Sequence, residues 1–277
     1  MAKVSVLLPV YYKESVENLH VCLASIENQT LVPDEIVLAL DEPSNSEIES
    51  EIEKFSSKTS ISVRRCYIKR GSGLGAVLRC GVENCTGDYI ARMDVDDIAV
   101  PHRLEKQKNF LDQYEEIDVI GSNIAEFEQS KNEIIAYRNV PEADEACKEM
   151  LKRRDPINHM TAMYRKESIM KAGNYSVDMK SCEDTYLWTA FYAHGLRFAN
   201  IQECLVYAHA GKDMYERRAK SSAYYFVKKS IDYKYDVGLI SFWEGLFQKI
   251  ANYFILIVMN AKMRAFIYEN ILRKKNG

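Results

Sequence analysis

Apolar runs without polar interruption alternate with segments of helical periodicity through the first half of the chain. The first run is followed by apolar positions that recur at helical spacing between residues 16 and 26. Five such runs are predicted strands: 4–10, 35–40, 61–68, 89–93 and 117–121. Helices are predicted between them at 16–26, 44–55, 74–82 and 101–114. Because strands that alternate with helices build a mostly parallel sheet flanked by helices, the pattern predicts a Rossmann-like α/β fold.

The alternation weakens after Gly121, where the pattern predicts a mixed arrangement. The predicted elements there are a strand-rich stretch at 124–140, a helix at 142–153, a strand at 159–164 and a helix at 184–194. No Gly-, Ser- or Pro-rich linker and no internal repeat interrupts this part of the sequence. We therefore expect one domain over residues 1–210, followed by a basic amphipathic helical extension at 211–277.

The net charge of −3 is divided unevenly between these two parts. Residues 211–277 hold 13 Lys and Arg against 6 Asp and Glu, a balance of +7, which leaves −10 for residues 1–210. An acidic body argues against nucleic-acid binding, because contact with a phosphate backbone needs clustered basic side chains. Since 47% of the residues are hydrophobic, the chain can bury a core, which excludes a disordered protein.

The basic extension contains an apolar and aromatic segment, 239–259. Its most apolar part, 250–259, has only about half of the twenty residues that span a bilayer, so no transmembrane helix is predicted. Aromatic side chains flanked by Lys and Arg suit a helix that lies in the interface of an anionic membrane. A helix packed on the body or on a partner subunit would carry the same apolar face. Both peripheral membrane contact through residues 236–277 and ordinary packing are consistent with the sequence.

The seven cysteines are scattered, and no two of them form a C-x-x-C pair. This pattern is neither a disulfide framework nor a zinc site, and free thiols fit a reducing cytoplasm. The apolar run at 4–10 is too short for an export signal and contains Pro9. We expect a cytoplasmic protein, in peripheral contact with the inner face of the plasma membrane if the extension binds lipid.

Three carboxylates, Asp94, Asp96 and Asp97, directly follow the predicted strand at 89–93. Ligands of open α/β sheets bind beyond the carboxyl ends of the strands, which is where this cluster lies. The carboxylates repel one another, and a divalent cation with oxygen ligands would relieve the repulsion. Mg²⁺ or Mn²⁺ shared with a diphosphate suits this spacing. The alternative is a polar turn whose aspartates cap the next helix.

A glycine-rich segment, Gly71–Ala76, follows the third predicted strand and opens a helix. It satisfies G-x-G-x-x-A, and Asp94 ends the next strand, as a dinucleotide-binding fingerprint requires. That fingerprint usually occupies the first strand-to-helix turn, whereas two such units precede it here. We favour a loop that lies against a nucleotide, where glycine lets the backbone approach closely. A Gly-rich turn with close helix packing is the structural alternative.

A second acidic pair, Glu183 and Asp184, begins a predicted helix that carries Leu187, Trp188 and Phe191. Carboxylates at a helix N-terminus interact favourably with the helix dipole, so simple capping explains the pair. A general base opposite a metal-bound leaving group is the functional interpretation, and it gains weight from the acidic cluster some ninety residues earlier.

In combination, these features resemble family 2 glycosyltransferases with the GT-A fold, and most of all the bacterial exopolysaccharide enzymes of the amylovoran type. The matching segments run in the family's order along the chain: 5–11 (SVLLPVY), 25–30 (SIENQT), 33–38 (PDEIVL), 73–76 (GLGA), 87–97 (GDYIARMDVDD), 101–107 (PHRLEKQ), 155–161 (DPINHMT), 183–188 (EDTYLW) and 214–218 (MYERR).

The resemblance implies a donor site for a nucleotide-sugar, with UDP as the expected nucleotide. It implies that eleven residues line this site: Pro9, Tyr11, Glu14, Asp41, Gly71, Leu74, Gly75, Arg79, Arg92, Asp94 and Asp96. Among them, Asp96 and then Asp94 are the implied ligands of Mn²⁺ or Mg²⁺. His209 stands where the family often has Arg, which leaves three roles open: metal ligand, phosphate donor or ordinary surface histidine.

The resemblance also implies the acceptor side and the reaction. Asp184 matches the family's general base, and the implied acceptor contacts are His159, Glu183 and Trp188. Arg217 and Arg218 are expected near the diphosphate of a polyprenyl-diphosphate-linked saccharide, because Arg forks match phosphate oxygens. The implied reaction is an inverting single displacement in capsule, exopolysaccharide or O-antigen assembly. Two other classes stay open: an NAD(P)-dependent oxidoreductase built on the Gly71–Ala76 loop, and a non-catalytic membrane-peripheral module.

Overall fold

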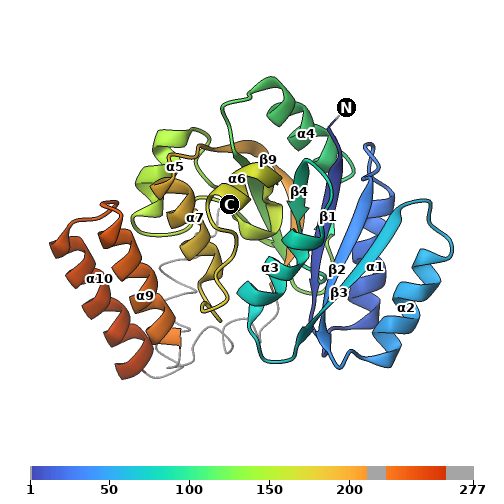
Figure 1. Ribbon diagram of the computed structural model, residues 1–277, viewed down its shortest axis with the longest axis horizontal. Coiled ribbons are helices and arrows are strands. Elements are labelled where there is room, and N and C mark those ends of the chain that lie inside the picture. Colours follow the sequence, from blue (N-terminus) through green and yellow to red (C-terminus); the bar gives the residue numbers. More distant parts are fainter. Residues whose placement is uncertain (1, 211–222, 260–277) are drawn as a thin grey trace.

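The computed structural model describes residues 2–210 and 223–259. Within them, nine strands form one mixed sheet in the order β3-β2-β1-β4-β8-β6-β9-β5, with β7 paired to β6 (Figure 1). The parallel half consists of four strands: β1 (Val4–Val10), β2 (Glu35–Glu42), β3 (Ser62–Lys69) and β4 (Tyr89–Arg92). These are the predicted strands, and they place their carboxyl ends at one edge of the sheet.

The second half of the sheet is mixed. β8 (Met163–Arg165) runs antiparallel between β4 and β6 (Val119–Phe127), and β9 (Phe198–His209) runs parallel to β6. Two further strands pair antiparallel: β5 (Ile98–Ala99) with β9, and β7 (Ile134–Arg138) with β6. The predicted α/β sheet flanked by helices is confirmed, and of its eight strand pairings among the described residues four are parallel and four antiparallel.

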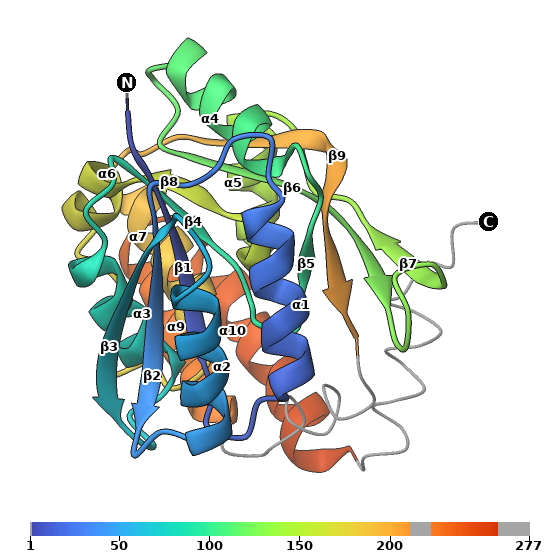
Figure 2. The ribbon, with the colours of Figure 1, turned by 90° about the vertical axis from the view of Figure 1, so that its right-hand side faces the viewer.

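Helices cover both faces of the sheet (Figure 2). On one face α1 (Val16–Glu27), α2 (Ser46–Ser56) and α4 (Arg103–Gln113) pack on alternate residues of the strands, such as Leu8. On the other face α3 (Leu74–Asn84), α5 (Asp144–Leu151), α6 (Lys166–Lys171) and α7 (Glu183–Ala193) pack around Leu7 and its neighbours. Adjacent strand residues thus point to different cores, which explains the uninterrupted apolar runs.

Two details differ from the sequence prediction. A 3₁₀ turn, His159–Thr161, occupies the first part of the predicted strand at 159–164, and the strand begins only at Met163. β9 was not predicted, because its central residues 202–204 are polar or partly exposed and interrupt the apolar pattern. Its pairing with β6 shifts register twice near Asn123, so neither strand keeps a regular alternation.

The C-terminal part of the described chain is helical. α9 (Ala223–Asp236) packs on α7, where the Tyr233 ring stacks on Tyr186 at 4.4 Å between centroids. Ile231, Leu239 and Ile240 belong to the same buried cluster as the sheet residues. α10 (Phe242–Tyr253) follows, with a capping box between Ser241 and Glu244, and a π-helical turn covers Phe254–Val258. None of the helices in the described ranges has the length and apolarity needed to span a membrane.

Candidate active site

The carboxyl ends of β1 and β2 meet around Asp41. Asp41 is buried at the end of β2, and its carboxylate accepts the backbone N–H of Tyr12 at 3.4 Å. The Arg70 guanidinium lies 3.6 Å from the centroid of the Tyr12 ring, and the neighbouring Tyr11 side chain is half exposed. Tyr12 and Arg70 were not singled out from the sequence, although each directly adjoins a predicted site residue. An exposed aromatic pair beside a buried carboxylate can receive a base and hydrogen-bond its edge.

Pro9 and Glu14 lie on either side of this aromatic pair. Pro9 is in β1, in register with Ala39 of β2. Glu14 precedes α1, and its carboxylate accepts the Ser15 backbone N–H and the Asn18 side-chain amide, each at 2.9 Å. Both residues are therefore fixed at the carboxyl edge of the sheet, where they were expected.

The glycine-rich loop between β3 and α3 contacts a segment far along the chain. Gly71 and Gly73 have φ of +84° and +94°, a conformation that favours glycine. A Cβ on Gly75 would lie 2.5 Å from the Ser176 carbonyl oxygen, and the Lys180 Nζ donates to the Gly71 carbonyl at 3.2 Å. The loop therefore holds residues 176–180, which lead to Glu183 and Asp184. Leu74 packs against the buried core.

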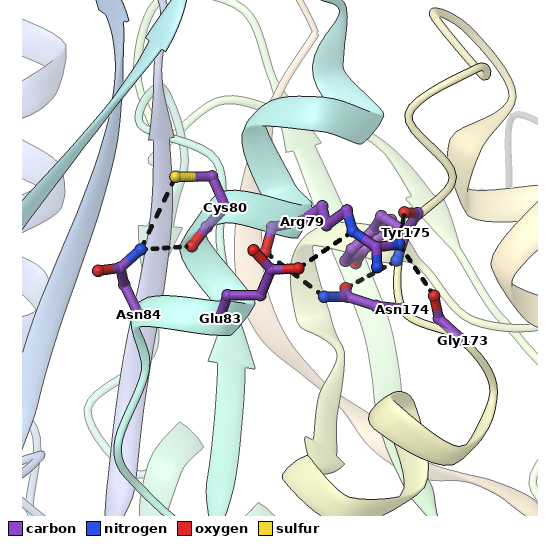
Figure 3. A network of polar contacts seen from close by, with 7 residues as sticks. All are labelled: Arg79, Cys80, Glu83, Asn84, Gly173, Asn174 and Tyr175. Carbon is purple, nitrogen blue, oxygen red and sulfur yellow. Dashed lines mark hydrogen bonds and ion pairs between the residues drawn. The ribbon is translucent and has the colours of Figure 1, made fainter.

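Arg79 lies further along α3, and its contacts are internal to the fold (Figure 3). Its guanidinium donates to the Gly173 and Tyr175 carbonyls at 3.0 and 3.1 Å and pairs with Glu83 at 3.1 Å. Asn174 donates in turn to the Arg79 carbonyl. These bonds tie α3 to the 173–175 turn and leave 37% of the Arg79 side chain exposed, so its contact with the donor stays a prediction.

The acidic cluster follows β4, as predicted. Asp94 forms a two-point ion pair with the buried Arg92, with N–O distances of 2.8 and 2.6 Å. Carboxylate oxygens of Asp94, Asp96 and Asp97 all lie within 4.8 Å of one another. Asp97 is almost fully buried, and one of its oxygens has no hydrogen-bond partner. Burial raises the pKa of Asp97 well above its usual value, and the negative charges of Asp94 and Asp96 raise it further.

β9 brings His209 to this cluster. Its backbone N–H donates to Asp97 at 2.8 Å, its Nε2 is 3.0 Å from the Glu128 carbonyl, and its Nδ1 lies 3.5 Å from an Asp96 oxygen. With Nε2–H donating to that carbonyl, Nδ1 faces the carboxylate. Hydrogen bonding to Asp96 raises the pKa of His209. The structure thus places His209 beside the acidic cluster, where a metal ligand would be.

The second acidic pair begins α7. Glu183 is buried and Asp184 is partly exposed, and Asp184 accepts the Thr185 backbone N–H at 2.8 Å. The Thr185 hydroxyl donates to Asp155 at 2.7 Å, so a third carboxylate, which the sequence reasoning did not select, joins the pair. Burial and then the Asp184 charge raise the pKa of Glu183 to about 8 and that of Asp155 to about 7.

Arg92 connects the two acidic groups. Burial acts to lower its pKa, but the negative charge of Asp94, followed by Tyr175, Asp97 and Glu183, outweighs that effect and raises it. The Glu183 carboxyl senses both Arg92 and Asp94. Charges from two carboxylate clusters some ninety residues apart in sequence therefore act on the same buried guanidinium.

Three predicted acceptor contacts, His159, Glu183 and Trp188, are buried. The Nε2 of His159 and the Tyr175 hydroxyl form a 2.7 Å hydrogen bond. Burial lowers the pKa of His159 well below its usual value, and the positive charge of Arg92 lowers it further. Trp188 is fully buried with its ring edge-on to His159 at 5.9 Å. Buried side chains offer little surface to an acceptor in this structure, and the contact of these residues with it stays a prediction. Arg217 and Arg218 lie outside the described residues.

The sequence profile of glycosyl transferase family 2 matches residues 5–172. The chain belongs to this family. A protein of Haemophilus influenzae described as an uncharacterised glycosyltransferase is 35% identical over 272 residues, which cover 98% of this chain and 100% of that protein. The amylovoran biosynthesis glycosyltransferase AmsE of Erwinia amylovora is 30% identical over 96% of this chain and 97% of its own.

A third relative of this glycosyltransferase is an Escherichia coli protein named UDP-Gal:alpha-D-GlcNAc-diphosphoundecaprenol beta-1,3-galactosyltransferase. The two sequences are 28% identical over an alignment that covers 98% of this chain and 97% of the Escherichia coli protein. Membership of the family makes the protein a transferase, which sets aside the oxidoreductase and the non-catalytic module.

Solved structures agree on the fold. TarS 1–349 of S. aureus in complex with UDP-GlcNAc has a TM-score of 0.69 at 18% identity, covering 91% of this chain and 72% of its own. The mannosyltransferase PcManGT of Pyrobaculum calidifontis, in complex with GDP-Man and Mn²⁺, has a TM-score of 0.63 at 13% identity, covering 98% and 76%. Both therefore share the overall fold of this chain.

Proposed function

We propose that this glycosyltransferase moves a sugar from a UDP-sugar to a saccharide acceptor with inversion at the anomeric carbon. The observation that carries the proposal is the presence of two acidic groups, Asp94–Asp97 and Glu183–Asp184, that share buried Arg92. Asp94 forms a two-point ion pair with this guanidinium, and the charge of Glu183 also acts on it. One group suits a cation and diphosphate, and the other suits removal of a proton. The bacterial polysaccharide relatives support the transfer to a saccharide.

The acidic cluster fits a divalent cation. Three carboxylates with oxygens within 4.8 Å, one of them with an unpartnered buried oxygen, form an oxygen-rich donor set of the kind that Mg²⁺ and Mn²⁺ take. Asp94 is paired with Arg92, so Asp96, Asp97 and the adjacent His209 are the best placed to hold the ion. When bound, the ion would neutralise charge on the departing nucleoside diphosphate. Asp97 was not among the predicted ligands.

The donor nucleotide is proposed to lie across Asp41, the Tyr11–Tyr12 pair and Arg70. Asp41 offers a carboxylate to the edge of a base, the tyrosine rings offer a stacking surface, and Arg70 supplies positive charge. The TarS complex contains UDP-GlcNAc, and the Escherichia coli relative is named for UDP-Gal, which supports UDP as the nucleotide.

Asp184 is the proposed general base. It removes the proton of the acceptor hydroxyl as the oxygen attacks the anomeric carbon, and the bond to the diphosphate oxygen breaks on the opposite side of that carbon. The positive charge that develops on the sugar resembles that of glycoside hydrolysis. The inverted product and the nucleoside diphosphate leave, and the proton passes from Asp184 to solvent.

A lipid-linked acceptor and a peripheral place at the inner face of the plasma membrane complete the proposal. The name of the Escherichia coli relative includes a diphosphoundecaprenol-linked acceptor. The outer side of α10 exposes Trp243, Phe247 and Ile250, with 74%, 72% and 60% of each residue accessible. Apolar and aromatic side chains on one side of a helix, in a basic segment, are typical of interfacial binding. The division into domains at residue 210 stays a prediction.

Thermal unfolding in the presence of nucleotides tests the donor and the cation together. We expect UDP with Mn²⁺ to raise Tm, because a ligand that binds only the folded state stabilises it by mass action. GDP and NAD with Mn²⁺, and UDP with EDTA, should have smaller effects. Stabilisation by NAD and not by any nucleotide or nucleotide-sugar would contradict the proposed donor.

Transfer assays with a matched pair of variants test the base. Asp184→Asn keeps the size and the hydrogen bond from the Thr185 N–H but cannot take a proton, so we expect kcat to fall by about 100-fold or more. Donor-induced stabilisation should persist in this variant. Asp236→Asn, at an exposed position at the end of α9, is the control and should retain activity. Full activity of Asp184→Asn would overturn the assignment.

A further inference from the structure

The segment at 101–107, which leads into α4, has no part in the function proposed so far. Two of its polar side chains are buried: Arg103 has 1% and Gln107 0% of the residue exposed. Arginine and glutamine are mostly surface residues, and their burial without hydrogen-bond partners is costly. The partners that these two side chains have in the fold therefore indicate what they do.

The Arg103 guanidinium reaches the end of β4. One of its terminal nitrogens donates to the backbone carbonyl of Arg92 at 2.6 Å, and its Nε donates to the Gln107 Oε1 at 3.1 Å. Arg92 is the last residue of β4, and the acidic cluster begins two residues later with Asp94. Burial lowers the pKa of Arg103 to about 10, and the negative charge of Asp97 acts in the opposite direction, so the guanidinium is charged at neutral pH.

Gln107 continues the network to the other side of β4. Its amide nitrogen donates to the backbone carbonyls of Thr161 at 2.6 Å and of Ile120 in β6 at 3.2 Å. Ala162 follows Thr161, and its carbonyl accepts the backbone N–H of Arg92 at 2.8 Å. The hydrogen bonds therefore form a closed ring, in which the N–H and the carbonyl of Arg92 are both held.

This hydrogen-bonded ring fixes the direction in which the Arg92 side chain leaves the strand. The Arg92 guanidinium makes the two-point ion pair with Asp94, a geometry that tolerates little rotation of either group. The Asp94 carbonyl in turn accepts from the Cys22 thiol at 3.6 Å and from the Asp97 backbone N–H at 3.3 Å. A change in the Arg92 backbone would therefore be passed on to the carboxylates that follow it.

We propose that Arg103 and Gln107 are positioning residues that hold the end of β4, and with it the acidic cluster, in the geometry that binds the cation and the diphosphate. This inference rests on the proposed cation site at Asp94–Asp97. The two side chains act through the backbone of Arg92. Removal of groups that orient metal ligands through hydrogen bonds lowers metal affinity by about 10–100-fold.

Titration of Mn²⁺ into the full-length enzyme with excess UDP tests the inference, with Tm and the electron paramagnetic resonance signal of free Mn²⁺ as readouts. Arg103→Lys keeps the charge, but an ammonium lacks the planar fork that reaches Arg92 and Gln107 together. We expect the Mn²⁺ concentration at half saturation to rise by about tenfold or more. Gln107→Met, which keeps the length and removes the amide, should raise it as well.

Leu111→Ala is the matched control. Leu111 is fully buried in the same helix, and its truncation leaves a cavity without removing any hydrogen bond of the ring. This variant should lower the Tm of the free enzyme and leave half saturation by Mn²⁺ at the wild-type value. The double variant of Arg103→Lys and Gln107→Met should have about the effect of one change, because either change opens the same ring.

The outcomes distinguish a positioning role from a purely structural one. If Arg103→Lys and Gln107→Met lower Tm as Leu111→Ala does, and all three bind Mn²⁺ as the wild type does, the inference is wrong. Should Arg103→Lys fail to fold, Gln107→Met decides between the same two results. If the wild type itself shows no response to Mn²⁺ with UDP, the proposed cation site is wrong and the inference fails with it.

Discussion

The pKa of Glu183 is raised to about 8 because the carboxyl is buried beside Asp184, and the positive charge of Arg92 offsets this only in part. At neutral pH its environment favours the protonated form, whereas Asp184, one residue later, is partly exposed. The raised pKa of Glu183 follows from burial and neighbouring charge, because the carboxyl itself is the same as that of any exposed glutamate.

Stability should fall with rising pH because of Glu183. The pKa of Glu183 is about 8 in the folded state and near 4.5 in the unfolded state. Between these two pH values the folded state holds a proton on Glu183 that the unfolded state has lost. The stabilising effect of this proton therefore decreases as pH rises toward about 8. Glu183→Gln keeps the shape without the titration. We expect its Tm to equal that of the wild type near pH 5 and to exceed it by roughly 2–4 °C at pH 8. If the difference in Tm between Glu183→Gln and the wild type were the same at every pH, the raised pKa of Glu183 would be contradicted.

The proposed cation depends on Asp96, the cluster member nearest the His209 ring. Asp96→Asn should abolish most of the rise in Tm that Mn²⁺ with UDP produces, and lower kcat/KM by about 100-fold, because an amide is a weaker ligand than a carboxylate. Melting curves at increasing Mn²⁺ concentration measure this. Asp236→Asn is the control, and an unchanged Mn²⁺ response of Asp96→Asn would exclude that residue as a ligand.

Helix α3 shows how an element positions a site without touching a substrate. Its first turn carries the glycines that admit residues 176–180, and Arg79 near its middle fastens the 173–175 turn (Figure 3). Asn174 has φ of +62°, an uncommon conformation for a residue with a side chain, and its amide donates to the Arg79 carbonyl. Both ends of the segment that precedes Glu183 are thereby attached to one helix.

Loss of Arg79 should affect stability more than donor binding. Arg79→Met removes two hydrogen bonds to backbone carbonyls and should lower the free energy of unfolding by about 1–3 kcal/mol. Glu83→Gln, which removes only the exposed ion pair, should cost less than about 1 kcal/mol. Urea denaturation of both variants, with KM for the donor, checks this. A large rise in donor KM for Arg79→Met without loss of stability would support the predicted contact of Arg79 with the donor.

At the scale of the whole molecule, the sheet and the C-terminal helices together form the enzyme. The parallel half carries the proposed donor side and, beyond β4, the acidic cluster, to which β9 of the mixed half brings His209. α9 packs against the helix that carries Asp184. The two roles considered for the extension, packing on the body and contact with a membrane, therefore concern different helices. α9 is packed on the body, while the outer side of α10 is left exposed.

The exposed side of α10 should bind anionic membranes. Replacing Trp243 and Phe247 together by Glu should reduce co-sedimentation with phosphatidylglycerol vesicles by about tenfold or more, because it removes apolar contact and adds negative charge. Activity on a soluble acceptor should be retained. Val32→Glu, at an exposed apolar position in the α1–β2 loop, is the control. Undiminished vesicle binding of the double variant would leave α10 without a role at the membrane.

The sequence by itself determined the parallel half of the fold and the location of the chemistry. The runs at 4–10 and 35–40 are apolar on both faces, and Asp94 and Asp96 follow a strand, so topology alone places them at the carboxyl edge. The family also followed from motif order, and the matching profile and relatives confirm it.

Only the tertiary structure decided which side chains are neighbours. Asp155 and Arg70 entered the candidate site, and His209 joined the acidic cluster, because loops and β9 bring them there, and the local sequence pattern does not show such long-range contacts. The tertiary structure also decided that Trp188 is fully buried and that Arg79 donates to the distant backbone carbonyls of Gly173 and Tyr175. The residue type determines which chemistry a side chain is capable of. Its burial and the charges of its neighbours determine its protonation state and contacts, and both depend on the packed fold.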